Sequence, residues 1–423
     1  MVRRTIKLAA LAALATTLTT LPAFAISGAW TATWYASPQA TWGPDFALPT
    51  GVPALLAQQT VRETARISVG GNRVRIVLSN RYGTQPIHIG AARVARAARD
   101  NDNTSAPAPF APGLPLTFGG LPQVTIAPGA PLVSDPVDLR VAALEQLAVS
   151  IYLPHATPLA TFHWGAQQTG WIHNGDATAA PTGQPIALHG RALLTGILVE
   201  NNTRRDVIVA LGDSITDGNG STPDQDRRWP DYLAATMARK GIAVVNAGIS
   251  GARLLGDRMG ANAAARFAPD VLDQPGVTTV VVLLGINDIG WPGSAFAPDE
   301  PPMTAPRMIA AYRQLIAQAR ARGVRIIGAT LPPFDGALHG TPFDGYYTPA
   351  KEAIRRDINR WIRDSGEFDA VTDLDAAQRD PQHPARLLPR FDSGDHLHPG
   401  DAGYEAIAAA VAITLERISL ANP

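Results

Sequence analysis

The sequence contains no cysteine among its 423 residues. This absence excludes disulfides, thiolate metal sites, cysteine nucleophiles and a lipidated amino-terminal cysteine. Excess charge is also absent, because 36 basic residues balance 36 acidic ones. Such a chain lacks the long-range field that attracts nucleic acid or an anionic membrane, so we expect no nucleic-acid partner. After the first 25 residues no apolar run is long enough to cross a bilayer, and we expect no membrane span.

The amino terminus has the pattern of an export signal. A basic start precedes the apolar run Leu8–Leu21, and Ala-Phe-Ala at 23–25 supplies the small residues that a signal peptidase needs. Residues 1–25 are therefore predicted to be a cleavable signal peptide of a secreted or periplasmic protein. An uncleaved anchor is the alternative, which the short run, its threonines and Pro22 disfavour. The remaining chain is long enough for two sizeable cores.

Residues 26–200 have the pattern of β-structure. Two alternating runs flank Gly70-Gly71-Asn72, which predicts a hairpin. Further strands are expected at Val124–Ile126, Leu147–Leu153 and Leu193–Val199, with one helical turn near Leu55. Turns rich in proline and glycine separate these runs at spacings typical of an all-β sandwich.

Residues 206–420, after a junction at 201–205, alternate short apolar strands with helical stretches. The predicted strands are Val207–Leu211, Ala243–Asn246, Thr279–Leu284, Val324–Leu331 and Phe368–Leu374. The predicted helices are Pro230–Lys240, Pro306–Arg322, Pro349–Asp364 and Asp401–Glu416. This pattern predicts an α/β fold with a five-stranded parallel sheet and helices on both faces. Ligands bind such sheets beyond the carboxyl ends of the strands.

Residues capable of chemistry follow these strands. Ser214 comes after the first strand, where its hydroxyl faces the expected crevice, although serine in such a turn often serves as a cap. Gly248 and Gly251 follow the second strand and either let a backbone N–H approach a ligand or form a tight turn. Asn287 follows the third strand and either donates its amide to a developing oxyanion or caps the next element. The donor role predicts an Asn287→Ala variant that loses turnover and keeps its thermal midpoint.

Asp395 and His398 stand three residues apart near the end of the chain. On one helical turn the carboxylate would accept a hydrogen bond from the imidazole and fix its tautomer. His396 and His398 form a His-x-His pair that could instead bind a metal, but no further cluster of ligands completes such a site in the sequence. The loop Pro332–Pro349 follows the fourth strand and should border the same crevice.

Together these segments resemble the SGNH (GDSL-type) hydrolases. Their four blocks occur in order: Gly-Asp-Ser at 212–214, a glycine after Asn246, Gly-x-Asn-Asp at 285–288 and Asp-x-x-His at 395–398. The resemblance implies a flavodoxin-like α/β/α sandwich with Ser214 as nucleophile, His398 as base and Asp395 as its orienting carboxylate. It also implies an oxyanion hole formed by the N–H groups of Ser214 and Gly251 and the amide of Asn287. No cofactor or metal is implied.

The segment Trp-Tyr-Ala-Ser-Pro-Gln at 34–39 and the β-rich region resemble the bacterial arylesterase/acylhydrolase branch of that family. This resemblance implies a secreted serine esterase acting through an acyl-enzyme on small-molecule esters or on acetyl esters of plant polysaccharide. A lysophospholipase or lipase, a flavin-binding module and a non-catalytic carbohydrate-binding protein are the alternatives. Five tryptophans of the β-rich region could stack on sugars or pack in the core: Trp30, Trp34, Trp42, Trp164 and Trp171.

Overall fold

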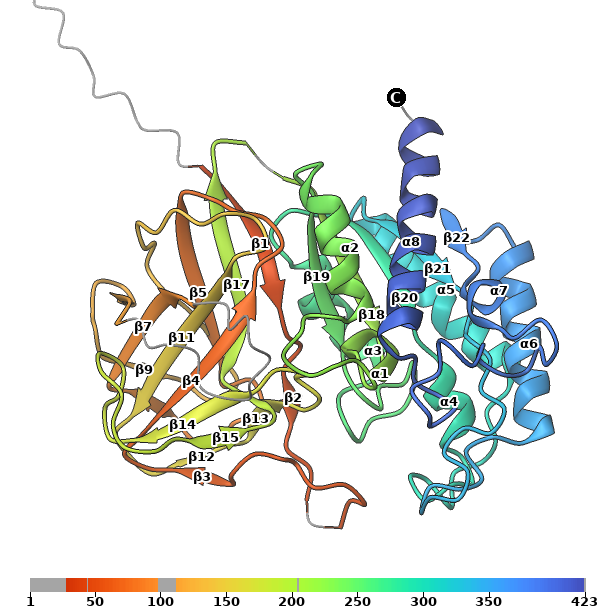
Figure 1. The fold of residues 1–423 in the computed structure, drawn as a ribbon, viewed down its shortest axis with the longest axis horizontal. Coiled ribbons are helices and arrows are strands. Elements are labelled where there is room, and N and C mark those ends of the chain that lie inside the picture. The colour runs from red at the N-terminus through yellow and green to blue at the C-terminus, as the bar shows by residue number, and fades with distance from the viewer. Residues whose placement is uncertain (1–27, 44, 98–111, 204, 422–423) are drawn as a thin grey trace, which may run out of the picture.

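The computed structural model describes residues 28–43, 45–97, 112–203 and 205–421. The predicted signal peptide lies outside the described residues. Figure 1 shows an all-β region, hereafter the β region, beside a region of alternating strands and helices, hereafter the α/β region. The last strand of the β region ends at Asn201, where the predicted junction begins, and the first strand of the α/β region starts at Val207.

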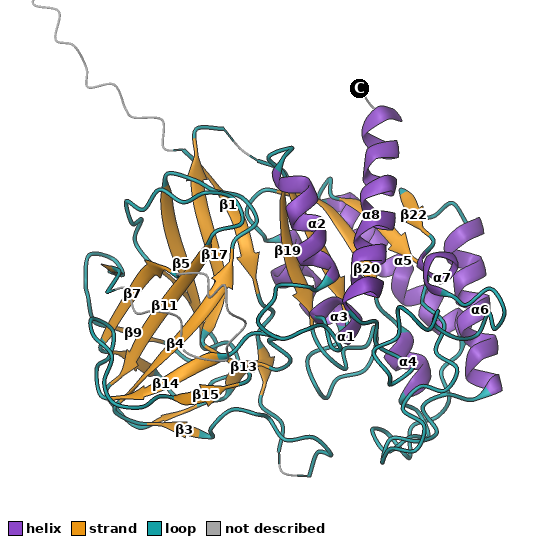
Figure 2. Cartoon of the chain, in the orientation of Figure 1, coloured by secondary structure: helices purple, strands orange, loops and turns teal. Residues whose placement is uncertain are grey.

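The β region contains two larger antiparallel sheets and three small ones (Figure 2). The four-stranded sheet has the order β1 (Ala29–Tyr35), β17 (Leu194–Asn201), β5 (Arg73–Ser79), β10 (Pro131–Val133). The six-stranded sheet has the order β15 (Ile186–Leu188), β14 (Gly170–Asn174), β4 (Gln59–Arg66), β11 (Gln146–Leu153), β7 (Ala91–Arg96), β8 (Leu114–Pro115). The small sheets are β16 (Arg191–Ala192) with β13 (Thr161–His163) and β2 (Gln39–Ala40), β12 (Thr157–Pro158) with β3 (Leu55–Leu56), and β6 (Ile87–Ile89) with β9 (Val124–Ile126).

Two local predictions for this region are wrong. The strands on either side of Gly70-Gly71-Asn72 do not form a hairpin, because β4 pairs with β11 and β14 whereas β5 pairs with β17 and β10. The glycines instead let the chain turn from one sheet to the other, and a Cβ on Gly70 would lie 2.3 Å from the carbonyl oxygen of Val141. The residues near Leu55 form the short strand β3, paired with β12, rather than a helical turn.

The α/β region contains the predicted five-stranded parallel sheet. Its order is β19 (Ala243–Gly248), β18 (Val207–Gly212), β20 (Val277–Leu283), β21 (Arg325–Ala329), β22 (Ala370–Thr372). In chain order this is 2-1-3-4-5, which is the flavodoxin-like arrangement. All six residues of β18 are buried, as expected for a central strand covered on both faces. The predicted fold class is confirmed.

Helices cover both faces of this sheet. They are α1 (Ser214–Asp217), α2 (Trp229–Ala238), α3 (Ala263–Phe267) continuing into the π-helical turn η1 (Ala268–Leu272), α4 (Ile286–Gly290), α5 (Ala305–Ala321), α6 (Pro349–Asp364), α7 (Leu374–Gln378) and α8 (Asp401–Ala421). The helices α2 and α8 pack together, and α5 packs against α3 and α6. Among the described residues, no helix has both the length and the apolar character needed to cross a membrane.

The two regions share one contiguous apolar core. Strand β1 lies against β19, and backbone hydrogen bonds reinforce the contact: the Ala32 N–H donates to the Pro275 carbonyl at 2.9 Å. The Val244 N–H donates to the Ser68 hydroxyl at 3.2 Å, and the Tyr35 hydroxyl donates to Asp270 at 2.9 Å. The β region is therefore packed on the α/β region rather than tethered to it.

Candidate active site

Ser214 lies at the carboxyl edge of the parallel sheet, directly after β18. Asp213 caps the short helix α1, and its carboxylate accepts the N–H of Ile215 at 3.0 Å. Gly218 ends the helix with φ of 107°, in the left-handed region that favours glycine. This sharp strand-to-helix turn leaves the Ser214 hydroxyl near the surface and its N–H at the open end of the helix.

The structure brings Ser214, His398 and Asp395 together in one hydrogen-bond chain. The Oγ of Ser214 lies 2.8 Å from Nε2 of His398, and the Nδ1 of His398 lies 2.6 Å from Oδ2 of Asp395. The segment carrying Asp395 and His398 is not a helical turn, contrary to the sequence-based expectation, because His396 has φ of 62°. Asp395 closes the turn by accepting the N–H groups of Leu397 and His398 on Oδ1.

These contacts determine the charge of Asp395. Burial alone would raise the pKa of its carboxyl, but the side-chain hydrogen bond and charge of His398, together with the two backbone N–H donors, hold that pKa well below its usual value. The carboxylate therefore stays ionised at neutral pH and accepts a hydrogen from Nδ1. Nε2 then faces the serine hydroxyl as an acceptor, which is the arrangement required of a general base.

Two backbone donors near Ser214 have no partner among the described residues: the N–H groups of Ser214 and Gly251. Gly251 has φ of 75°, and a Cβ there would lie 2.3 Å from the sulfur of Met259, so both the conformation and the space require glycine. The Gly248 N–H, by contrast, donates to the Oδ1 of Asn246 at 2.8 Å. Gly251 rather than Gly248 thus has an N–H free for a ligand.

The third predicted donor, Asn287, is buried in α4 and its amide orientation is fixed. Its Oδ1 accepts the indole N–H of Trp291 at 3.1 Å and the hydroxyl of Tyr346 at 2.7 Å. Indole N–H is a donor only, so the oxygen must face Trp291 and the NH₂ group must face the opposite way. One N–H of that group donates to the Ala252 carbonyl at 3.0 Å, which leaves the second for a ligand. The bonds of its side chain go to Ala252, Trp291 and Tyr346, and none of these residues is at the start of α4.

Asp288 and Tyr346 also contact residues of this cluster, and the sequence-based interpretation named both without assigning either a role in the site. The fully buried Asp288 accepts the N–H of Leu254 at 2.7 Å and of Leu255 at 3.1 Å, so it ties the loop after β19 to the start of α4. Burial raises the pKa of Asp288 to about 6 although these bonds oppose the shift. In the sequence, only the position of Asp288 beside Asn287 in the Gly-x-Asn-Asp block indicated that it could lie near the site. Tyr346 comes from the loop predicted to border the crevice.

His396 points away from this chain of groups. Its Nδ1 bonds the carboxylate of Asp392, and its side chain is 54% exposed. Within the described ranges, no set of three histidine or carboxylate side chains is arranged to hold a metal ion. A His-x-His metal site would therefore lack its remaining protein ligands here.

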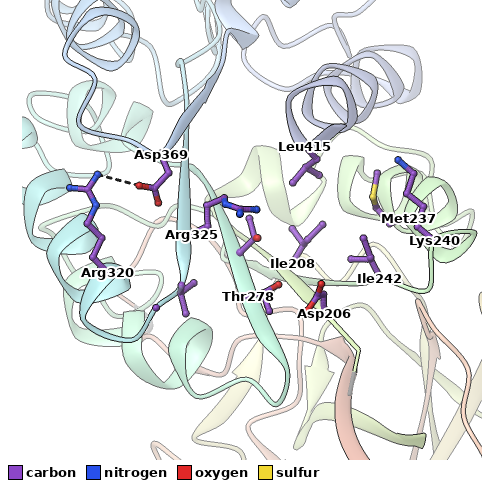
Figure 3. A pocket seen from close by; sticks show the side chains of 13 residues that line it. Asp206, Ile208, Met237, Lys240, Ile242, Thr278, Arg320, Arg325, Asp369 and Leu415 are labelled. Carbon is purple, nitrogen blue, oxygen red and sulfur yellow. Dashed lines mark hydrogen bonds and ion pairs between the residues drawn. The ribbon is translucent and has the colours of Figure 1, made fainter. Parts of the chain in front are cut away.

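A cavity of about 500 Å³ lies elsewhere, at the amino edge of the sheet. Figure 3 shows its lining by Asp206, Thr278 and Arg325, which lie within one residue of the starts of β18, β20 and β21. Arg320 and Asp369 form an ion pair at 3.2 Å on its rim. Ligands of such folds bind at the opposite edge, so the Ser214 cluster rather than this cavity is the candidate active site.

A flavodoxin-like sheet with a Ser–His–Asp hydrogen-bond chain at its carboxyl edge defines the fold and the site of a hydrolase. Residues 210–406 match the GDSL-like lipase/acylhydrolase family. The α/β region is a GDSL-like acylhydrolase domain, and the protein is an ester hydrolase.

Solved structures similar to this chain include three esterases or lipases. A carbohydrate acetylesterase family member from Sinorhizobium meliloti is 18% identical, with a TM-score of 0.39, over 51% of this chain and 99% of its own. The aryl esterase of M. smegmatis is 16% identical, with a TM-score of 0.39, over 50% and 99%. A GDSL-like lipase from Bacteroides thetaiotaomicron is 17% identical, with a TM-score of 0.36, over 51% and 89%. Among curated proteins none matches the chain.

Proposed function

We propose that the protein is an exported serine esterase that hydrolyses short-acyl carboxylic esters through an acyl-enzyme, with Ser214 as nucleophile. The observation that carries this proposal is the continuous chain from Asp395 through His398 to the Ser214 hydroxyl. Free N–H groups of Ser214 and Gly251 and the spare N–H of Asn287 lie at the same strand ends. A nucleophile, a base, an orienting group and oxyanion donors are the parts that acyl transfer requires.

In the first step, Ser214 Oγ bonds to the ester carbonyl carbon while its proton passes to Nε2 of His398. The carbonyl oxygen becomes an oxyanion held by the three donors, and ionised Asp395 stabilises the imidazolium. His398 then gives the proton to the departing alkoxide as the carbon–oxygen bond breaks. In the second step water replaces the alcohol, His398 takes its proton, and the carboxylic acid leaves with Ser214 restored.

The described surface favours a small ester over a lipid. The large exposed apolar side chains among the described residues come from different elements, and no strand or helix contributes two of them: Leu55, Leu114, Leu121, Val133, Ile186, Leu255 and Ile413. The aromatic side chains beside Asn287 pack on one another, since the ring of Phe296 stacks between those of Trp291 and Phe343 at 4.8 and 4.4 Å. The acetyl group of a substituted sugar or of a small alcohol suits such a site, and a long acyl chain does not.

The remaining alternatives lack support in the arrangement of residues. Of the five tryptophans of the β region, Trp34 is buried and the other four are half-buried, which favours packing over sugar stacking. A flavin-binding module or a non-catalytic binder has no use for an ionised Asp395 held against His398.

The test is a hydrolysis panel of acetyl, butyryl and long-chain aryl esters and acetylated xylan, run with a fluorophosphonate probe. We expect acetyl or butyryl esters to be cleaved fastest and the probe to label wild type but not Ser214→Ala. A preference for long acyl chains would favour the lipase alternative. Labelling or full activity of Ser214→Ala would refute the assignment of the nucleophile.

A further inference from the structure

Residues of the β region reach directly into the neighbourhood of the candidate oxyanion hole. Strands β2 and β13 lie on the side of the β region that faces the α/β region (Figure 1). At the end of β13 the imidazole of His163 is 5% exposed. Its Nδ1 lies 2.9 Å from the carbonyl oxygen of Ser37, and its Nε2 lies 3.0 Å from Oδ1 of Asp217 at the end of α1.

Asp217 relays this contact to the loop that carries Gly251. Its other oxygen, Oδ2, accepts the N–H of Ser250 at 2.9 Å and the hydroxyl of Ser250 at 2.6 Å. Both residues are 1% exposed, so water does not compete for these bonds. Because Ser250 directly precedes Gly251, the direction of the Gly251 N–H depends on the position of Ser250, which Asp217 holds.

The hydrogen bonds of His163 restrict the orientation of its imidazole ring. Nδ1 faces a backbone carbonyl and Nε2 faces a carboxylate, and both are acceptors, so a hydrogen on either ring nitrogen has a partner. The ring is thus held at both ends, by the β region on one side and by α1 on the other. Breaking the buried contact between His163 and Asp217 should cost more stability than the intact contact contributes. The contact is therefore suited to holding Asp217 in one position.

A second contact from the β region holds the other side of the same loop. Gln39 donates its amide to the carbonyl of Met259 and accepts the N–H of Trp164 at 2.6 Å. Met259 packs against Gly251, where a Cβ would come within 2.3 Å of its sulfur. Ser37 and Gln39 both belong to the Trp-Tyr-Ala-Ser-Pro-Gln segment at 34–39, to which the proposed reaction gives no role.

We infer that the β region helps to position the candidate oxyanion hole through a few residues at its contact with the α/β region. Among these, His163 is a positioning residue which acts through Asp217 and Ser250 to aim the Gly251 N–H at the oxyanion. Gln39 supports the same loop through Met259. This inference rests on the proposed function, because it assigns the Gly251 N–H to transition-state stabilisation. Loss of a positioning contact should lower kcat and leave KM nearly unchanged, since the oxyanion forms only in the transition state.

The principal test compares two substitutions at position 163 in the full-length protein. His163→Gln places an amide near the former Nε2 and keeps a donor for Asp217, whereas His163→Asn keeps a donor only for the Ser37 carbonyl. We expect His163→Asn to lower kcat for an aryl acetate by about 10- to 100-fold, which is less than the loss of a whole oxyanion donor. His163→Gln should stay within about fivefold of wild type. His173→Asn is the stability control, because that buried histidine bonds within the β region.

A second pair of variants disturbs the contact without removing a hydrogen bond. Gly165 and Gly175 both have φ of 71°, so alanine strains the backbone equally at either position. A Cβ on Gly165 would lie 2.7 Å from the Ser250 hydroxyl and 2.8 Å from Oδ2 of Asp217, whereas one on Gly175 would meet nothing within 4 Å. We expect Gly165→Ala to lower kcat and Gly175→Ala to leave it unchanged.

The outcomes separate the inference from the proposed function. Equal kcat for His163→Asn, His173→Asn and wild type would overturn the inference, as would equal effects of Gly165→Ala and Gly175→Ala. A matching loss of kcat in His163→Gln and His163→Asn would also overturn it, because the donor to Asp217 would then be irrelevant. If His163→Asn does not fold, the glycine pair decides. An active Ser214→Ala variant would instead overturn the proposed function and leave the contacts of His163 without this role.

Discussion

Replacing Asn287 separates catalysis from stability only if the replacement keeps the acceptor side of its carboxamide. Asn287→Ala removes the partner of three buried groups: the Ala252 carbonyl, the Trp291 indole and the Tyr346 hydroxyl. Each buried group left unpaired costs about 1–3 kcal/mol, so we expect a loss of at least about 3 kcal/mol. For a domain of this size that corresponds to a fall of roughly 6–12 °C in Tm.

This expectation differs from the one drawn from the sequence alone, in which Asn287→Ala keeps its thermal midpoint. The alanine variant should lose both stability and turnover, and it cannot by itself distinguish the two roles. Asn287→Asp is the sharper change. It has the same shape and keeps an oxygen for Trp291 and Tyr346, but the NH₂ group is replaced by an oxygen that repels an oxyanion. The Ala252 carbonyl also loses its donor, so this variant gives up one buried hydrogen bond where the alanine variant gives up three.

We expect Asn287→Asp to lower kcat by at least about 10²–10³, with KM changed much less. Tyr346→Phe is the matched control, because it removes one hydrogen bond to the acceptor side and spares the NH₂ group. That variant should lose about 1 kcal/mol of stability and no more than about fivefold in kcat. The assay measures kcat and KM on an aryl acetate and the Tm of the same preparation. Near-normal kcat in Asn287→Asp would refute the donor role.

Three further predictions concern other residues. His398→Ala should lower kcat by about 10⁴-fold or more. His396 is half-exposed and paired with Asp392, so His396→Ala should keep kcat within about tenfold of wild type. Equal losses of kcat in folded variants would contradict the assignment. Burial raises the pKa of Asp213 to about 7. Between roughly pH 4 and 7 the folded protein therefore keeps a proton on Asp213 that the unfolded chain has released. The free energy of unfolding should fall as pH rises through that window. Asp213→Asn preserves the helix cap and should flatten this dependence in urea unfolding measured at pH 5 and 8; an unchanged slope would contradict the cause. Amino-terminal sequencing of the native protein should begin near Ile26, and an intact Met1 would contradict export.

The α/β region was predictable because its signals are local. The strands are short apolar runs, fully buried in β18 and half-buried at the edge strand β22, and each longer helix begins at a recognisable cap or proline. The helix α6 begins as predicted at Pro349, because Thr348 accepts the N–H of Lys351 and proline suits the first turn. The chemistry-bearing residues followed strand ends, and parallel strands bring their carboxyl ends to one edge. Their proximity could thus be expected although Ser214 and His398 are 184 positions apart.

The β region was less predictable because its pairings are non-local. Gly70-Gly71-Asn72 has the composition of a turn. The pairing of the strands on either side of it, however, is decided by β11 and β17, which are distant in the sequence. The contact of His163 with Asp217 had no local signal either. An aspartate at the end of a short helix suggests nothing about a histidine 54 positions earlier, and only the packing of the two regions brings them together.

The smallness of α1 explains why the β region is needed beside it. A helix of four residues is far below the length that is stable alone, so its geometry must come from side chains around it. Asp213 caps its start, while Trp229 donates to the Thr216 hydroxyl at 3.2 Å and Asn246 donates to the Thr216 carbonyl at 2.8 Å.

Asp217, the last residue of α1, accepts the N–H of Ser250. The other carboxylate oxygen of Asp217 lies within hydrogen-bond distance of His163 from the β region. Without that partner a buried carboxylate would keep only the donors of Ser250, on one of its two oxygens. The cost of leaving the other oxygen unpaired would favour displacement of Asp217 towards water, and Ser250 and Gly251 would move with it. An oxyanion donor is effective because it is already in place when charge develops, so a displacement of this kind affects the rate before it affects binding.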